Sequence, residues 1–176
     1  YLRDAQDHVL IFFFFYLGYI TYAMRSAVVE ILTQRLGQSF DESSLVLTCT
    51  HTHSGPGGCS HDALYNVVTP GFVSDNLQQI VNASVEAILA AQQSAVPTEL
   101  ELASGRFAND VPVAWNRSLH AYNQNPDVVP QDKSNAHLAL DRIMPILSFR
   151  RDGELQSLLS FFGVHATCIG NTQEKY

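Results

Sequence analysis

The stretch LVLTCTHTHSGPGG, residues 45–58, decides how this chain folds and where its chemistry lies. Its first half, Leu45 to Thr50, is apolar and rich in β-prone residues, so it predicts a strand. Its second half ends in glycines and a proline, which predict a tight turn. Side chains two apart on an extended backbone point to the same face. His51 and His53 are therefore expected to project together at the end of the strand.

Two imidazoles presented in this way suit a metal ion. Taken alone, the pair fits equally well two surface histidines on a loop. The glycine-rich turn has neither the Lys-Ser/Thr pair of a P-loop nor the GxGxxG spacing of a dinucleotide site. The sequence therefore excludes a P-loop and a dinucleotide-binding site. Metal binding remains as the functional interpretation of this stretch.

Upstream, the run VLIFFFFYL at residues 9–17 predicts a strand buried on both faces. A membrane anchor over 9–24 is the alternative, but this run contains Gly18 and is shorter than the roughly 20 residues that a bilayer requires. Residues 22–36 then change to a helical period, with Gly37 as the stop. Strand, helix and strand in this order predict a parallel βαβ unit, which places reactive groups at the carboxyl end of its second strand.

Downstream, a second helix is expected to begin near Thr69-Pro70 and to be stopped by Pro97. Residues 99–103 alternate like a strand. The polar stretch 109–130 is long for a loop inside a compact domain, and its Trp115 and Tyr122 favour an ordered, functional loop over a disordered one.

Two further strands are expected at 143–149 and 155–164, joined through Asp152-Gly153, which is a strong hairpin signal. The second of these strands is expected to run directly into His165. The whole pattern predicts an α/β fold with a mixed β-sheet and flanking helices, forming part of a catalytic domain.

Composition limits the domain organisation and the partners. With 176 residues and 46% hydrophobic content, the chain is expected to form a single, incomplete domain over 1–176, and both ends look cut from something longer. A net charge of -7 without any basic stripe excludes a nucleic-acid surface. Cys49, Cys59 and Cys168 are expected to be reduced, with a local disulfide between the first two as the alternative.

Three motifs carry a family resemblance: THTHSGPGG at 50–58, WNRS at 115–118 followed by YNQNP at 122–126, and FGVH at 162–165. Their order and spacing resemble the amino-terminal catalytic region of the neutral/alkaline, non-lysosomal ceramidases. The resemblance covers nearly the whole chain, and the first motif is highly specific.

This resemblance implies a zinc-dependent amidase that hydrolyses ceramide (N-acylsphingosine) or a related N-acyl lipid. It implies that His51 and His165 are zinc ligands and that His53 and Arg117 line the active site beside the metal. In that arrangement Arg117 would steady charge on the carbonyl oxygen. The resemblance also implies secretion or a cell-surface location and allows peripheral contact with a membrane, while the oligomeric state stays open.

The chain also departs from the family pattern. The family's other zinc ligands, a glutamate and a tyrosine, and its proposed serine nucleophile have no match up to Tyr176. We therefore expect the 176-residue chain by itself not to turn over ceramide. Two other functions stay open at this point: hydrolysis of another N-acyl lipid or amide, and a non-catalytic metal- or lipid-binding module.

Overall fold

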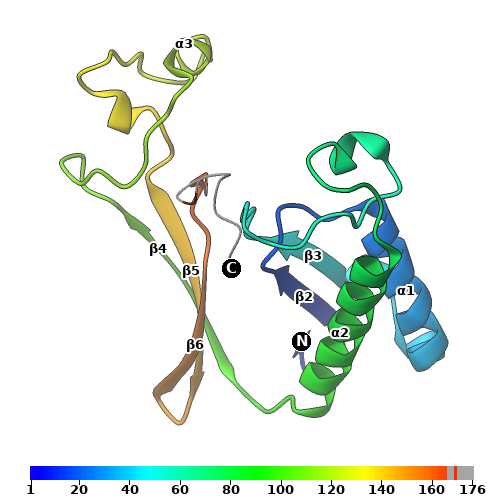
Figure 1. Cartoon of the computed structure of the whole chain (residues 1–176). Helices are drawn as coiled ribbons and strands as arrows, with labels where there is room; N and C mark the ends of the chain where they lie inside the picture. Colours follow the sequence, from blue (N-terminus) through cyan, green and yellow to red (C-terminus); the bar gives the residue numbers. More distant parts are fainter. Residues whose placement is uncertain (166–168, 170–176) are drawn as a thin grey trace. The chain divides into compact units, whose positions relative to one another are not determined.

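The computed structural model describes residues 1–165 and 169, which fold as two compact units, Tyr1–Ala95 (unit 1) and Val96–His165 (unit 2) (Figure 1). Unit 1 contains a three-stranded sheet in the order β1-β2-β3. β1 (Leu2–Arg3) pairs antiparallel with β2 (Val9–Phe15), and β2 pairs in parallel with β3 (Leu45–Cys49). The sheet is therefore mixed, as predicted.

Helix α1 (Tyr22–Leu36) connects the two parallel strands. It begins at Thr21, whose hydroxyl accepts a hydrogen bond from Met24 N, and it ends at Gly37, which adopts a left-handed φ of 57°. These two caps explain why the predicted bounds of this helix are correct, because each cap satisfies groups that the helix itself leaves unpaired. The predicted parallel βαβ unit is confirmed.

Helix α2 (Ser74–Gln93) packs beside α1 on the same side of the sheet (Figure 1). The core between the helices and the sheet is made of buried aliphatic side chains: Ile11, Val28, Leu32, Leu45, Val81, Val85, Ile88 and Leu89. Each such side chain contributes roughly 1.5–3 kcal/mol when it leaves water. Leu45, the first residue of β3, belongs to this core, so the core anchors the strand that leads to the histidine stretch.

Two sequence predictions for unit 1 are wrong. The phenylalanine-rich strand is not buried on both faces, since Ile11 and Phe15 are buried whereas Leu10 and Phe14 are about 40% exposed (40% and 43%). Both helices pack on the Ile11 side of the sheet, where Phe13 and Phe15 also face the core, so Leu10 and Phe14 point away from it. In addition, α2 begins at Ser74 rather than near Thr69, as explained with the site below.

No helix among residues 1–165 is long and apolar enough to cross a bilayer. The alternative of a membrane anchor over 9–24 is therefore wrong, because this stretch forms β2 and the start of α1. Cys49 and Cys59 are free thiols, as predicted, and Cys168 lies outside the described residues.

Unit 2 is an antiparallel sheet in the order β4-β5-β6, formed by β4 (Glu99–Arg106), β5 (Ile143–Arg151) and β6 (Glu154–Ser160). Asp152 and Gly153 form the predicted two-residue hairpin turn, with positive φ angles of 53° and 79°. β6 ends at Ser160, so the prediction of a strand running directly into His165 is wrong. Just after β6, Phe161 N donates a hydrogen bond to the carbonyl of Pro145 in β5 (3.0 Å).

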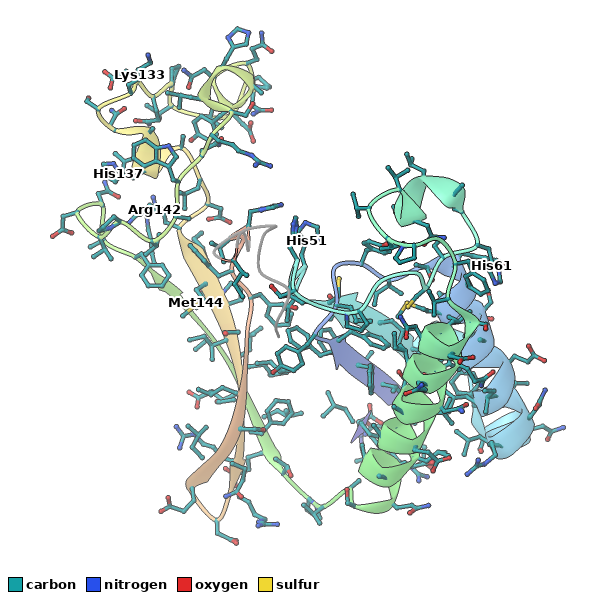
Figure 2. All side chains as sticks on the ribbon, viewed as in Figure 1. His51, His61, Lys133, His137, Arg142 and Met144 are labelled. Atoms are coloured by element: carbon teal, nitrogen blue, oxygen red, sulfur yellow. The ribbon has the colours of Figure 1, made fainter. Side chains whose placement is uncertain are left out.

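The long segment between β4 and β5 is ordered by buried polar contacts, and it contains the short helix α3 (Leu119–Tyr122) and a 3-10 helix (Ala136–Leu138). Arg142 is 1% exposed, and its guanidinium donates to the carbonyls of Phe107, Ala108, Val111 and His137 (Figure 2). Asn123 forms two further hydrogen bonds with the backbone of Gln131 (2.8 and 2.9 Å). The expectation of an ordered loop is confirmed. Among these hydrogen bonds, those of Arg142 hold the largest number of the segment's backbone carbonyls in place.

Candidate metal centre and substrate pocket

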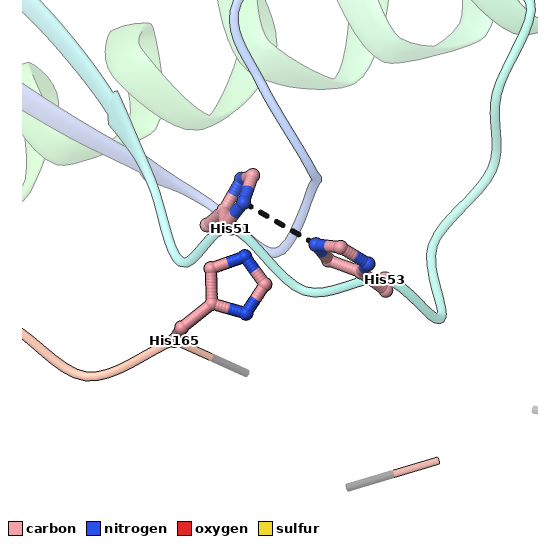
Figure 3. Close-up of side chains that lie close together, drawn as sticks. All are labelled: His51, His53 and His165. Atoms are coloured by element: carbon pink, nitrogen blue, oxygen red, sulfur yellow. Dashed lines mark hydrogen bonds between the residues drawn. The ribbon is translucent and has the colours of Figure 1, made fainter. Parts of the chain in front are cut away.

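His51 and His53 follow the carboxyl end of β3, where the parallel pairing with β2 has just ended. Their rings pack edge to face with centroids 4.8 Å apart (Figure 3). The geometry that brings them together differs from the predicted one, because His51 has a φ of 56° and is not extended. Left-handed backbone is uncommon for residues other than glycine and often marks functional sites. The pair is thus produced by a turn rather than by the alternation of a strand.

The hydrogen bonds of His51 define its tautomer. Its Nδ1–H donates to the main-chain carbonyl of Gly18 at 2.5 Å, which leaves Nε2 as the nitrogen that carries a lone pair. The Nε2 of His53 lies 3.2 Å from this atom, so His53 donates its Nε2–H there when no cation is bound. A histidine ligand that donates its other ring N–H to a carbonyl is the usual arrangement at protein metal sites. This hydrogen bond therefore fits the predicted role of His51 as a metal ligand through Nε2.

The glycine-rich turn after the histidines lets the chain pass close to the loop that precedes α2. A Cβ atom on Gly57 would lie 2.5 Å from Cγ2 of Thr69, and one on Gly58 would lie 2.8 Å from the carbonyl oxygen of Gly71. Gly58 also has a φ of 75°, and its carbonyl accepts a hydrogen bond from Val73 N (2.8 Å). The predicted need for glycine here is confirmed at both positions.

The same contacts explain the late start of α2. The Thr69 hydroxyl does not cap a helix but donates to the carbonyls of Asn66 (3.0 Å) and Gly71 (3.2 Å). Val73 donates its N–H to Gly58 and has an extended backbone (φ -120°, ψ 98°), so it is the N-cap and the helix begins at the next residue. The Thr-Pro signal at 69–70 therefore marks a turn of the loop.

A pocket of about 740 Å³ opens beside the two imidazoles, entirely within unit 1. Leu17, Met24 and Val73 contribute apolar surface to the pocket, while Thr52 and Asn76 are among its polar lining residues. Concave sites that are largely apolar with a few convergent polar groups are typical of small-molecule binding. The arrangement suits a ligand with an apolar body and a polar, reactive part.

Arg117 and His165 both belong to unit 2. Arg117 is exposed and follows Asn116, whose side chain is fixed by hydrogen bonds to Ala139 O (2.7 Å) and from Ser118 N (2.8 Å). His165, also drawn in Figure 3, is exposed and lies five residues after the end of β6. Their expected roles, beside the metal for Arg117 and as a zinc ligand for His165, stay predictions.

The sequence analysis missed one contributor to the site, Gly18. It acts through its main-chain carbonyl, which orients His51, and a backbone acceptor has no side-chain pattern. Its position directly after the phenylalanine-rich strand is the only available signal, because a loop leaving β2 must pass beside the loop leaving the adjacent β3.

Comparison with known proteins identifies the family. The sequence profile of the neutral/alkaline non-lysosomal ceramidases, N-terminal region, matches residues 2–175. This chain is a member of that ceramidase family. The neutral ceramidase of Pseudomonas aeruginosa is 37% identical over 156 residues, which are 88% of this chain and 22% of that protein. Neutral ceramidase B of Dictyostelium discoideum is 35% identical over 147 residues, 82% of this chain and 20% of that protein.

The fold agrees with solved ceramidase structures. The crystal structure of the Pseudomonas aeruginosa neutral ceramidase superposes with a TM-score of 0.86 at 34% identity, over 97% of this chain and 26% of that one. A ceramidase complexed with C2 gives a TM-score of 0.82, over 93% of this chain and 24% of that one. The predicted α/β fold of a partial domain is confirmed, and the chain spans about a fifth of the length of the curated relatives it matches.

Proposed function

We propose that this chain forms part of a zinc-dependent amidase that hydrolyses N-acylsphingosine to sphingosine and a fatty acid. Membership of the ceramidase family supports hydrolysis of this class of lipid. The observation that carries the proposal is the pairing of His51 and His53 beside a largely apolar pocket, since a reactive centre and a binding surface meet there. Secretion or a cell-surface location, implied by the same family, stays a prediction.

His51 and His165 would hold the zinc ion. The donor chemistry of His51 fits this role, because the bond from Nδ1–H to Gly18 aims a lone pair on Nε2 away from the backbone. Neutral imidazole nitrogens are common zinc ligands. A zinc ion bound there supplies Lewis acidity, which polarises an amide carbonyl and acidifies a water molecule.

His53 and Arg117 would act on the substrate. His53 Nε2 lies 3.2 Å from Nε2 of His51, so this imidazole would be close enough to the reacting amide to accept or pass on a proton. Arg117, with its five donors, would steady the charge that develops on the carbonyl oxygen. The apolar wall of the pocket would receive part of the lipid and exclude water from the reacting group.

The test uses the protein expressed with all coding sequence downstream of Tyr176, compared with its His51→Ala and His53→Ala variants. We expect the parent to contain zinc and to release fatty acid from ceramide. His51→Ala should lose both zinc and activity, whereas His53→Ala should keep zinc and lose activity by about 100-fold or more. The matched control is His8→Ala, which removes an exposed histidine whose ring bonds Asp4 and should change neither.

Retention of zinc and activity in His51→Ala would refute the assignment. Faster hydrolysis of a short N-acyl amine than of ceramide would assign another N-acyl substrate to the same chemistry. Metal binding without any amide hydrolysis would instead support a non-catalytic metal-binding module. The 176-residue chain with added zinc should show no ceramide turnover, and robust activity would overturn that expectation.

A further inference from the structure

The loop between Gly58 and α2 exposes an unusual run of apolar side chains. Figure 1 shows this loop extending beyond the ends of α1 and α2. Five large side chains within its residues 63–72, here called the rim loop, are exposed: Leu64 (73%), Tyr65 (50%), Val67 (74%), Val68 (92%) and Phe72 (46%). No charged residue occurs from Ala63 to Val73. Contiguous exposed apolar surface of this kind marks an interaction site.

The rim loop is nevertheless well structured, because its polar groups bond inward. The Tyr19 hydroxyl donates to the carbonyl of Tyr65 (2.6 Å), and the buried Asn66 side chain donates to the carbonyl of Ser60 (2.7 Å). The Asn66 carbonyl in turn accepts from the backbone N and the hydroxyl of Thr69 (3.1 and 3.0 Å). The carbonyls of Tyr65 and Asn66 are thus paired within unit 1, while the Oδ1 of Asn66 is buried without a hydrogen-bond partner among the described residues. Internal pairing of carbonyls beside exposed apolar side chains lowers the cost of moving a segment into a low-polarity phase.

The rim loop is continuous with the pocket. Val68, Thr69 and Pro70 line the same pocket as His51 and His53, so one wall of the pocket is built from this loop. Under the function proposed above, the substrate is an N-acyl lipid that resides in a membrane rather than in water. An apolar rim at the entrance of its pocket fits that source of substrate.

We propose that the rim loop inserts into the interfacial region of a lipid bilayer and so places the pocket entrance at the membrane surface. This inference rests on the proposed function only for the identity of the lipid, not for the insertion. The aliphatic side chains Leu64, Val67 and Val68 enter the acyl boundary, and Tyr65 lies at the headgroup level, where tyrosine is enriched. Because the chain carries a net charge of -7, the attraction comes from apolar insertion and not from basic residues.

The first experiment measures co-sedimentation of the protein with phosphatidylcholine vesicles that contain no ceramide. Leu64→Ser/Val67→Ser removes two exposed side chains that do not line the pocket (73% and 74% exposed). The matched control, Leu102→Ser/Val129→Ser, removes the same two residue types at equal exposure in unit 2 (77% and 74%). We expect the rim-loop variant to partition at least about tenfold more weakly than the parent. The control should partition like the parent, as should the parent when the salt is raised to about 0.5 M.

The second experiment places a fluorophore in the rim loop. Trp115 is the sole tryptophan of the chain, so Leu64→Trp in a Trp115→Phe background reports on that loop alone. Its emission should shift to the blue on addition of vesicles and should be quenched by lipids brominated on the acyl chain. Val129→Trp in the same background is the control and should show neither change. This readout holds even if the double serine variant fails to fold.

Equal partition of parent and rim-loop variant, or absence of quenching at position 64, would overturn the proposal. A change in oligomeric state of the rim-loop variant by sedimentation velocity, with no change in vesicle partition, would assign the loop to a second copy of the chain instead. Absence of vesicle binding by the parent protein, with ceramide hydrolysis intact, would refute the inference and leave the proposed function standing. Vesicle binding that depends on the rim loop, without any amide hydrolysis, would support the inference and refute the proposed function.

Discussion

Replacing Gly57 by alanine tests how closely the histidine turn must approach the rim loop. The new Cβ would lie 2.5 Å from Cγ2 of Thr69, more than about 1 Å inside ordinary carbon–carbon contact. Thr69 cannot simply rotate, because its hydroxyl bonds the carbonyls of both Asn66 and Gly71. Overpacking of this kind destabilises by about 1–3 kcal/mol, and losing either hydrogen bond adds about 1 kcal/mol.

A second substitution relieves the same contact. Thr69→Ser removes the methyl group and retains the hydroxyl, so by itself it should destabilise by about 0.8 kcal/mol for the lost methyl. In the Gly57→Ala background it should be stabilising, giving a favourable coupling energy of at least about 1 kcal/mol. Urea unfolding followed by far-UV circular dichroism measures all four proteins, since α1 and α2 dominate the helical signal of unit 1.

The control is Gly105→Ala, where an added Cβ meets nothing within 4 Å. It should leave the unfolding midpoint nearly unchanged. A coupling energy below about 0.5 kcal/mol between the two substitutions, or equal destabilisation by Gly57→Ala and Gly105→Ala, would show that the turn tolerates a side chain and that the close-approach argument is wrong.

Two further predictions concern buried polar groups. Arg142→Met should destabilise unit 2 by about 2–4 kcal/mol, because the carbonyls that accept from the guanidinium lose their donor. Trp115 fluorescence during urea unfolding measures this loss of stability. The control replaces an exposed arginine, Arg151→Met, and its free energy of unfolding should stay within about 0.5 kcal/mol of the parent. Burial raises the pKa of the Cys59 thiol above its ordinary 9.0. The native state therefore favours the protonated form, so stability should fall as the pH rises past 9.0, where the unfolded thiol ionises; Cys59→Ser should weaken this alkaline loss, and an unchanged pH profile would contradict it.

The βαβ unit could be predicted from the sequence because its signals are local. The helix between β2 and β3 carries a clear apolar period and is closed by Thr21 and Gly37, two residues whose capping roles depend only on near neighbours. The Asp152-Gly153 turn is equally local, since both residues tolerate the positive φ that a two-residue hairpin requires. Features of this kind depend on a few residues that are close in the sequence, so they can be predicted from the sequence alone.

The features that could not be predicted depend on contacts between distant residues. Thr69 looked like a helix cap, but its hydroxyl bonds the carbonyl of Asn66, and Gly58 holds Val73 N. The phenylalanine run looked buried on both sides, but the helices of unit 1 cover only one face of its sheet. Arg142 carries no sequence signal at all, because its four partners are main-chain carbonyls supplied by residues up to 35 positions away.

The candidate site lies between these two cases. The HxH motif and the glycines after it identified the position of the pair, whereas the reason for its geometry was misjudged. A strand would have aligned the imidazoles by alternation; the left-handed φ of His51 aligns them by a turn instead. Sequence reasoning could find which residue types meet, but the backbone conformation that joins them depended on the neighbouring loop at Gly18.

That neighbouring loop has a consequence for how the centre can change through mutation. The group that fixes the protonated nitrogen of His51 is a peptide oxygen, so no exchange of one side chain for another can delete it. Only a shift in the path of the main chain could do so, and a Cβ on residue 18 would press on the oxygen of Thr52 at 3.3 Å. The orientation of His51 therefore survives side-chain substitutions nearby but depends on the path of the backbone. If His51 binds the proposed zinc ion, substitutions that move the end of β2 should change metal affinity even though they replace no predicted ligand.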